Sequence, residues 1–273
     1  MSQQTIGFIG LGNQGAPIAH RIAKAGFPLV VWARRPEALD MFTATGASAA
    51  PTVAALGAQC DHVGICVVND DDVAEVCRQL IPAMRPGSRI AIHSTVLPES
   101  CTTLEKQCAE RGIGLIDAPV SGGAAGAESG TLTIMCGGRQ DAFDASRPVF
   151  ESFGKLIVLL GAAGSGQRAK IVNNSLLAAN IGLADAALSA GEAMGLDRAT
   201  LAGLIRGSSG YSFGLEVCAR FPSPGAFARG AQLLVKDIGL LKTVLPDHGG
   251  AEALRAAADP FLTRAMRPQT AKL

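Results

Sequence analysis

The sequence predicts an α/β protein in which an N-terminal doubly wound sheet is joined by one long helix to an all-helical C-terminal domain. Three observations lead to this prediction. Short apolar runs alternate with helical patterns over the first ~160 residues, strand patterns stop after that point, and a glycine-rich turn follows the first apolar run. Alternating strands and helices favour a parallel sheet covered by helices on both faces.

The predicted strands are short runs rich in valine and isoleucine that stop at glycine, asparagine, aspartate or proline. The helical segments 15–26 and 71–84 lie between early strands, whereas the run at 131–138 follows its predecessor closely, so the far edge of the sheet is expected to be mixed. The strand runs are TIGFIGLG (5–12), LVVWAR (29–34), HVGICVV (62–68), RIAIHST (89–95), GLIDAPV (114–120), TLTIMCGG (131–138) and KLIVLLG (155–161).

The second part of the chain has only helical patterns. We therefore predict a nucleotide-binding domain at 1–163 and a helical substrate and oligomerisation domain at 164–273, with a connecting helix at 164–191. This connecting helix is apolar around most of its circumference, which predicts that a second subunit covers it in a homodimer or homotetramer.

Composition narrows the functional classes. Of 273 residues, 48% are hydrophobic and 17% charged, with a formal net charge of +1, which disfavours nucleic acid and anionic membranes as partners. Seven scattered cysteines without a CxxC pair, and four histidines without metal-ligand spacing, predict no metal site. The N-terminus lacks the features of a signal peptide, so a cytoplasmic protein is expected.

The glycine-rich turn has the sequence Gly10-Leu11-Gly12-Asn13-Gln14-Gly15, which fits G-x-G-x-x-G. It follows a strand and begins a helix, as the dinucleotide-binding fingerprint of a Rossmann domain requires. The first glycine permits the tight turn, the second lets backbone approach a pyrophosphate, and the third allows close helix–strand packing. An ordinary glycine-rich turn is the alternative, but the context favours dinucleotide binding.

The end of the second strand carries information about the cofactor. An acidic residue ~20 residues after the glycines would hold the ribose hydroxyls of NAD, but Arg34 and Arg35 stand 19 and 20 positions after Gly15. Guanidinium groups suit a 2′-phosphate, so NADP is favoured over NAD. Two solvated arginines on a turn are the alternative interpretation.

Polar residues also follow the next two strands. Asn69 and Thr95 stand where ligands bind in open α/β sheets, beyond the carboxyl ends of the strands, and could face the nicotinamide ribose. Asn69 could equally cap the helix that begins at Asp70. His93, at the same strand end as Thr95, could contact substrate.

Three further stretches are candidates for the chemistry. Ser121-Gly122-Gly123 could offer backbone N–H groups to a carboxylate, although a flexible turn is the alternative. Lys170 and Asn174 are four residues apart on one helical face, where a cation and an amide can hold and protonate a carbonyl oxygen. Lys236 and Asp237 stand in an otherwise strongly apolar helix, where an internal ion pair or a charged stripe is the alternative to a role in the site.

Together these motifs resemble the β-hydroxyacid dehydrogenase family, which includes 3-hydroxyisobutyrate dehydrogenase and tartronate semialdehyde reductase. The resemblance covers nearly the whole chain, through GFIGLGNQG, STVLP, DAPVSGG, GSGQRAKIVNN, SSGYS and KDIGL in order. Tyr211 departs from the family pattern, which often has arginine after SSG. The resemblance implies that Lys170 is catalytic, that Ser121–Gly123 and Asn174 bind substrate, and that Thr95, Lys236, Val67 and Val68 contact the cofactor.

The expected function is hydride transfer between NADP(H) and a small β-hydroxyacid or its semialdehyde, with Lys170 as proton donor or acceptor. An imine reductase of the same fold is one alternative, although such enzymes usually lack this lysine. A non-catalytic NADP-binding or assembly module is another, and it predicts cofactor binding without turnover.

Overall fold

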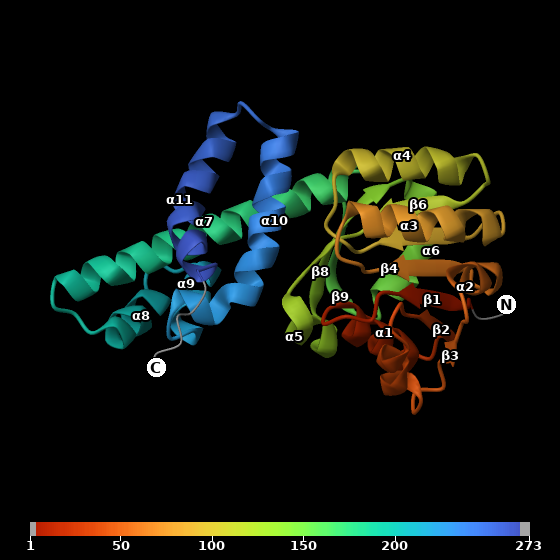
Figure 1. Cartoon of the computed structure of the whole chain (residues 1–273), viewed down its shortest axis with the longest axis horizontal. Helices are drawn as coiled ribbons and strands as arrows, with labels where there is room; N and C mark the ends of the chain where they lie inside the picture. The colour runs from red at the N-terminus through yellow and green to blue at the C-terminus, as the bar shows by residue number, and fades with distance from the viewer. Residues whose placement is uncertain (1–3, 268–273) are drawn as a thin grey trace. The chain divides into compact units, whose positions relative to one another are not determined.

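The computed structural model describes residues 4–267, which belong to two compact units. The first unit ends at Lys170 and the second begins at Ile171, so the division falls within a single long helix, α7 (Ser165–Ala193). Figure 1 shows strands and helices in the first unit and helices alone in the second. The predicted fold class is confirmed.

The first unit is built on one sheet with the strand order β3-β2-β1-β4-β5-β6-β8-β7, and β9 pairs with β8. Strands β3 to β6 pair in parallel, whereas β6 and β8 are antiparallel, so the predicted mixed edge is confirmed. The strands are β1 (Ile6–Ile9), β2 (Leu29–Trp32), β3 (Ser48–Ala49), β4 (His62–Ile65), β5 (Arg89–Ile92), β6 (Gly114–Asp117), β7 (Val120–Ser121), β8 (Leu132–Gly138) and β9 (Gly154–Leu159).

Helices cover both faces of this sheet (Figure 1). One apolar core lies beneath α1 and α6 and the other beneath α2, α3 and α4, because alternate strand residues such as Phe8 and Ile9 point to opposite faces. The helices that follow these strands in the first unit are α1 (Gly15–Lys24), α2 (Val53–Gln59), α3 (Asp70–Leu80), α4 (Pro98–Ala109), α5 (Gly123–Ser129) and α6 (Gln140–Phe150), with 3₁₀ turns at Pro36–Phe42 and Ile81–Ala83.

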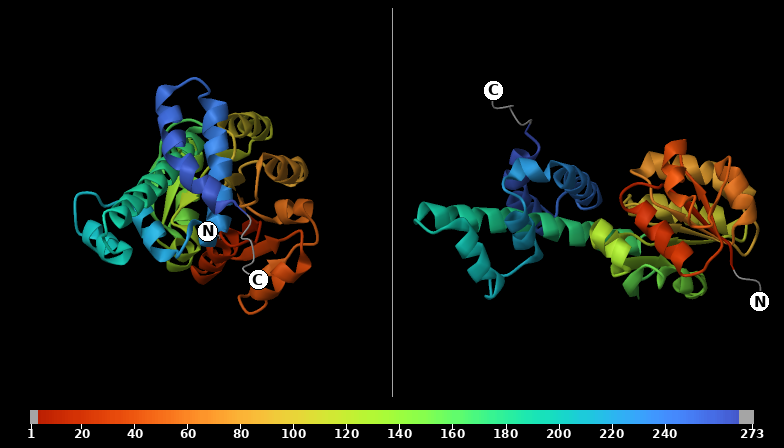
Figure 2. Two further views of the ribbon diagram at one scale, coloured as in Figure 1. Left: turned by 60° about the vertical axis from the view of Figure 1, so that its left-hand side comes forward. Right: turned by 90° about the horizontal axis from the view of Figure 1, so that it is seen from below.

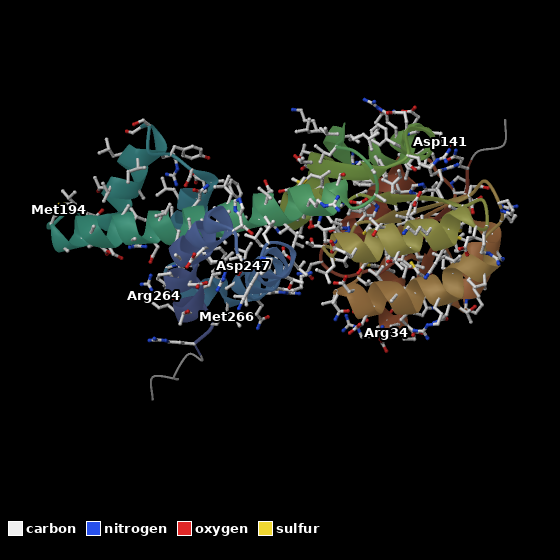
Figure 3. All side chains as sticks on the ribbon, turned by 90° about the horizontal axis from the view of Figure 1, so that it is seen from above. Arg34, Asp141, Met194, Asp247, Arg264 and Met266 are labelled. Carbon is white, nitrogen blue, oxygen red and sulfur yellow. The ribbon has the colours of Figure 1, made fainter. Side chains whose placement is uncertain are left out.

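The second unit packs its helices around the C-terminal part of α7. Helices α10 and α11 form an antiparallel pair, visible in Figures 1 and 2. Asp185 of α7 is buried and accepts hydrogen bonds from Arg198 at 2.9 Å and from Arg264, which is labelled in Figure 3. The remaining elements are α8 (Arg198–Arg206), α9 (Phe213–Arg220), a 3₁₀ turn (Pro224–Phe227), α10 (Ala228–Val244) and α11 (Gly249–Ala265).

Helix α7 is long and apolar enough to cross a membrane by length and composition. Half of its most apolar window is buried inside the structure, and core helices can meet the same criteria, so this one helix is weak evidence for a membrane span. Several large apolar side chains of α7, including Val172, Leu176 and Leu183, are exposed in the single chain.

Candidate active site

The glycine-rich loop has the geometry of a dinucleotide cradle. Gly10 has a φ of 95°, and a Cβ at this position would lie 2.2 Å from the carbonyl oxygen of Cys66. A Cβ at Gly15 would lie 1.9 Å from the carbonyl oxygen of Gly10, so α1 can begin this close to β1 only with glycine. Gly12, in contrast, has no atom within 4 Å of its Cβ position, which leaves its backbone open to a ligand.

A hollow of about 510 Å³ adjoins this loop, and Leu11, Gly12, Asn13, Arg35 and Glu37 are among the residues that line it. The residues present therefore fit the phosphate and ribose end of a dinucleotide: open backbone at a helix N-terminus, and a guanidinium beside it.

Arg34 lies outside this lining. It donates a hydrogen bond to Asp72 at 2.8 Å, and its labelled side chain lies at the surface beside α3 in Figure 3. Of the two predicted arginines, both among the residues that the structure describes, only Arg35 lines the hollow.

The carboxyl ends of β4 and β5 are joined by side chains. The Ser94 hydroxyl accepts a hydrogen bond from the Val67 N–H at 2.8 Å, so a cofactor contact by Val67 would have to use its carbonyl or side chain. Val68 is exposed. Asn69 caps α3 by accepting the Asp72 N–H at 2.9 Å, which is the alternative that the sequence left open; a cofactor contact by Asn69 stays a prediction.

The Ser121–Gly123 loop connects β7 to α5 and lies against the glycine-rich loop. Gly122 and Gly123 have φ values of 128° and 63°, which L side chains rarely adopt. The Gln14 side chain donates to the Gly123 carbonyl at 3.3 Å, although the two residues are 109 positions apart. The predicted substrate loop and the predicted cofactor loop are therefore neighbours in the first unit.

Lys170 lies on the second turn of α7 and is only 8% exposed, although lysine is usually a surface residue. Two side chains that the sequence reasoning did not single out hold the start of its helix. Gln167 hydrogen-bonds to backbone at Ser94 and Val96, and Asp117 accepts the N–H groups of Gly164 and Gln167 at 2.7 and 2.9 Å. Both residues stand inside the motifs already noted, GSGQRAK and DAPVSGG, but their partners are too distant in sequence to be found from it.

Asp117 is completely buried, and this burial raises its pKa to about 6 although the backbone N–H groups that it accepts favour the charged form. The helix N-terminus that it caps also favours a negative charge. At neutral pH the residue is therefore a carboxylate at the start of α7.

Asn174 lies one turn beyond Lys170, in the second unit. Its side-chain amide nitrogen donates to the Asp237 carboxylate at 2.5 Å, and its side-chain amide oxygen accepts from the Asn173 side chain at 3.1 Å. Asp237 is buried and also lies 3.5 Å from the Lys236 ammonium, which fits the ion pair considered from the sequence. A cofactor contact by Lys236 stays a prediction.

His93 is part of the core. Its ring packs against Phe8, Phe150 and Phe153, and its Nδ1 lies 2.8 Å from the Ala118 carbonyl oxygen. Burial lowers its pKa to about 4, so the ring is neutral at pH 7. Among residues 4–267, no group of three or more His, Cys, Asp or Glu side chains could hold a metal ion.

Comparison with known proteins agrees with this geometry. Residues 5–161 match the model of the NAD binding domain of 6-phosphogluconate dehydrogenase, and residues 164–272 match the model described as NAD-binding of NADP-dependent 3-hydroxyisobutyrate dehydrogenase. The chain belongs to the β-hydroxyacid dehydrogenase family. It is accordingly an oxidoreductase of small hydroxyacids with an NAD(P)-binding domain.

Relatives in this family differ in their named cofactors and substrates. The chain is 40% identical to the NAD-dependent L-serine dehydrogenase of Pseudomonas aeruginosa, over 86% of this chain and 83% of that protein. It is 34% identical to the mitochondrial 3-hydroxyisobutyrate dehydrogenase of Mus musculus, over 88% and 75%. The solved 3-hydroxyisobutyrate dehydrogenase of Mycobacterium tuberculosis with L-serine is 29% identical and has a TM-score of 0.85, covering 96% of this chain and 93% of that one.

Proposed function

We propose that this protein transfers a hydride between NADP(H) and a small β-hydroxyacid or its semialdehyde, and that Lys170 exchanges the proton. The observation that carries the proposal is a buried lysine one turn before a buried asparagine on α7, with the start of that helix bonded to the ends of β5 and β6. Relatives named for L-serine and 3-hydroxyisobutyrate, which are both β-hydroxyacids, support the substrate class.

The protein groups have separate roles in the proposed reaction. The nicotinamide, when bound, supplies or accepts the hydride. In the reductive direction the Lys170 ammonium donates a proton to the carbonyl oxygen, and in oxidation the neutral amine accepts the hydroxyl proton. Asn174 orients the same oxygen, and the backbone N–H groups of Ser121–Gly123 hold the substrate carboxylate.

The preference for NADP is part of this proposal. Arg35 beside the hollow at the glycine-rich loop supports it, as does Arg34 at the same strand end, because guanidinium groups bind phosphate through charge-assisted hydrogen bonds. Both cofactors occur among similar proteins, since one relative is named as NAD-dependent and the model that matches residues 164–272 is described as NADP-dependent.

The decisive experiment compares the wild type with Lys170→Ala and Lys170→Met. Loss of proton transfer should lower kcat by roughly 10²–10⁴-fold in both variants, while NADPH binding, measured by its fluorescence, stays within a few fold. Methionine keeps most of the buried side-chain volume, which separates the loss of the amine from the loss of packing. Unchanged turnover in either variant would refute the proton-transfer role.

A substrate panel separates the alternatives. Semialdehydes and β-hydroxyacids should be turned over, whereas turnover of cyclic imines alone would favour an imine reductase. Tight NADPH binding without turnover of any compound would favour a non-catalytic binding module. A homo-oligomeric, cytoplasmic protein is the form in which we propose that it works, and the exposed apolar side chains of α7 support the oligomer.

A further inference from the structure

Gln167 occupies an unusual position for a glutamine. It lies on the first turn of α7, three residues before Lys170, and its side chain is completely buried. The amide nitrogen donates to the Ser94 carbonyl at 2.8 Å, and the amide oxygen accepts the Val96 N–H at 3.1 Å. These two backbone groups flank Thr95, so the Gln167 side chain is bonded on both sides of that residue. Residues 94–97 are called the Thr95 segment below.

The Thr95 segment is held from other directions as well. Ser94 accepts the Val67 N–H at the end of β4, and the Asp70 carboxylate accepts the Leu97 N–H at 2.9 Å and the Ser100 hydroxyl at 2.6 Å. The segment is therefore a fixed support, and whatever bonds to it acquires a defined position relative to the end of β5.

Asp117 fixes the same helix at its N-terminus. Its two carboxylate oxygens accept the N–H groups of Gly164 and Gln167, and close packing at Gly166 leaves no room for a side chain, since a Cβ there would lie 2.2 Å from the Met135 carbonyl oxygen. Asp117 thus sets where α7 begins. Gln167 adds two direct hydrogen bonds from this helix to the backbone on either side of Thr95.

We propose that Gln167 is a positioning residue that sets the distance between the Lys170 amine and the nicotinamide side of the site at Thr95. This inference rests on the proposed function. A terminal amide on a chain of this length offers a donor and an acceptor together, which the Ser94 carbonyl and the Val96 N–H both require. Glutamate lacks the donor, methionine lacks both groups, and asparagine is one methylene shorter.

The expected size of the effect follows from the sensitivity of proton and hydride transfer to geometry, because a displacement of about 1 Å at a reacting group can cost on the order of 10²-fold in rate. Gln167→Met keeps the volume and removes both bonds. We expect its kcat to fall roughly ten- to a hundredfold, with NADPH affinity changed by less than about threefold. The deuterium isotope effect on kcat with 4-deuterated NADPH should rise, because misaligned chemistry becomes rate-limiting.

Gln167→Glu supplies a readout that a purely structural role would not change. As a carboxylate, the new side chain would face the Ser94 carbonyl without a proton to donate, whereas the protonated acid would restore both bonds. We therefore expect the kcat of this variant, relative to wild type at each pH, to recover as the pH is lowered. Gln59→Met is the matched control, since Gln59 is an exposed glutamine whose amide bonds within its own helix, to Ala55 at 2.8 Å.

The outcomes are distinguishable. A Gln167→Met enzyme with wild-type kcat and isotope effect overturns the positioning role, and so does a loss confined to NADPH affinity. If that variant does not fold, the pH dependence of Gln167→Glu decides: a constant ratio to wild type overturns the proposal, and recovery at low pH supports it. Failure of the proposed function itself would appear instead as unchanged turnover in Lys170→Ala.

Discussion

The amide of Asn174 donates to the carboxylate of Asp237 at 2.5 Å, and both side chains are more than nine-tenths buried. This bond connects α7 to α10 inside the second unit and fixes which way the Asn174 amide faces. The bond uses one of the two amide hydrogens, and the amide oxygen of Asn174 accepts a hydrogen bond from the Asn173 side chain at 3.1 Å.

The first prediction concerns this pair. Asp237→Ala should raise the substrate KM and lower the free energy of unfolding by about 1–3 kcal/mol, because a buried amide loses its acceptor. Asp237→Asn retains one acceptor oxygen, so its KM should rise less and its free energy of unfolding should fall less. Steady-state kinetics and urea unfolding measure the two effects. A loss of stability without any change in KM would show that the pair serves only the fold.

The second prediction separates folding from cofactor binding at the glycine-rich loop. Gly12→Ala should fold normally, because no atom lies within 4 Å of the new Cβ, yet it should bind NADPH at least about tenfold more weakly, because that Cβ obstructs the pyrophosphate. Gly203→Ala, also in open space but on α8, is the matched control. Thermal unfolding and NADPH titration give the answer, and normal NADPH affinity in Gly12→Ala would contradict the assignment.

The third prediction tests the choice of cofactor. Replacing Arg34 and Arg35 together by alanine should weaken NADPH binding by roughly 10²-fold and leave NADH nearly unchanged, since hydrogen bonds to charged groups contribute about 1.5–3 kcal/mol each. Asp72→Asn should have the opposite effect, because the Asp72 carboxylate competes with the 2′-phosphate for Arg34. Equal losses for both cofactors in the double variant would argue against 2′-phosphate recognition.

The fourth prediction is a loss of stability in acid. Burial lowers the pKa of His62 to about 3 and that of His93 to about 4, so between pH 6.5 and these values the unfolded chain takes up protons that the folded chain does not. Asp117 works in the opposite direction, because its raised pKa favours the folded state as the pH falls from about 6 to 3.8. The combined effect of the two histidines is larger than that of the single carboxyl. The free energy of unfolding should therefore decrease as the pH falls from 6.5 to about 4.

His62 supplies the variant that tests this account. Neither of its ring nitrogens has a hydrogen-bond partner among the described residues, and its ring lies edge-on to Phe150 at 5.8 Å between centroids. His62→Phe should therefore be at least as stable as the wild type at pH 7 and should lose less stability by pH 5. Urea titrations at the two pH values would contradict the prediction if both proteins lost stability equally.

Much of the fold could be predicted from the sequence because it depends on local signals. All seven apolar runs form strands, since each carries enough β-branched residues to define a buried strand by itself. The two-residue strands are the exceptions. Ser48–Ala49 lies outside the predicted runs and pairs with β2, and the run at 114–120 breaks after Asp117, so that its last residue, Val120, belongs to the separate strand β7 beside β8.

In the site, too, the features with a local sequence pattern could be predicted, and those that depend on partners distant in sequence could not. Gly10, Gly12 and Gly15 follow a local pattern, and their geometry agrees with it. Gln167 bonds to residues 71 and 73 positions away and Asp117 to residues 47 and 50 positions away, so nothing near either residue in the sequence reveals its role. Arg34 and Arg35 look equivalent as neighbours in sequence, but a carboxylate 38 positions distant binds one of them.

The boundary between the two units falls between Lys170 and Ile171, inside one uninterrupted helix. Four residues of α-helix have a fixed length of about 6 Å. The backbones of Lys170 and Asn174 are therefore about one helical turn apart, and their side chains share one face of α7. The spacing of the two groups proposed to hold the substrate oxygen is therefore set by α7 itself.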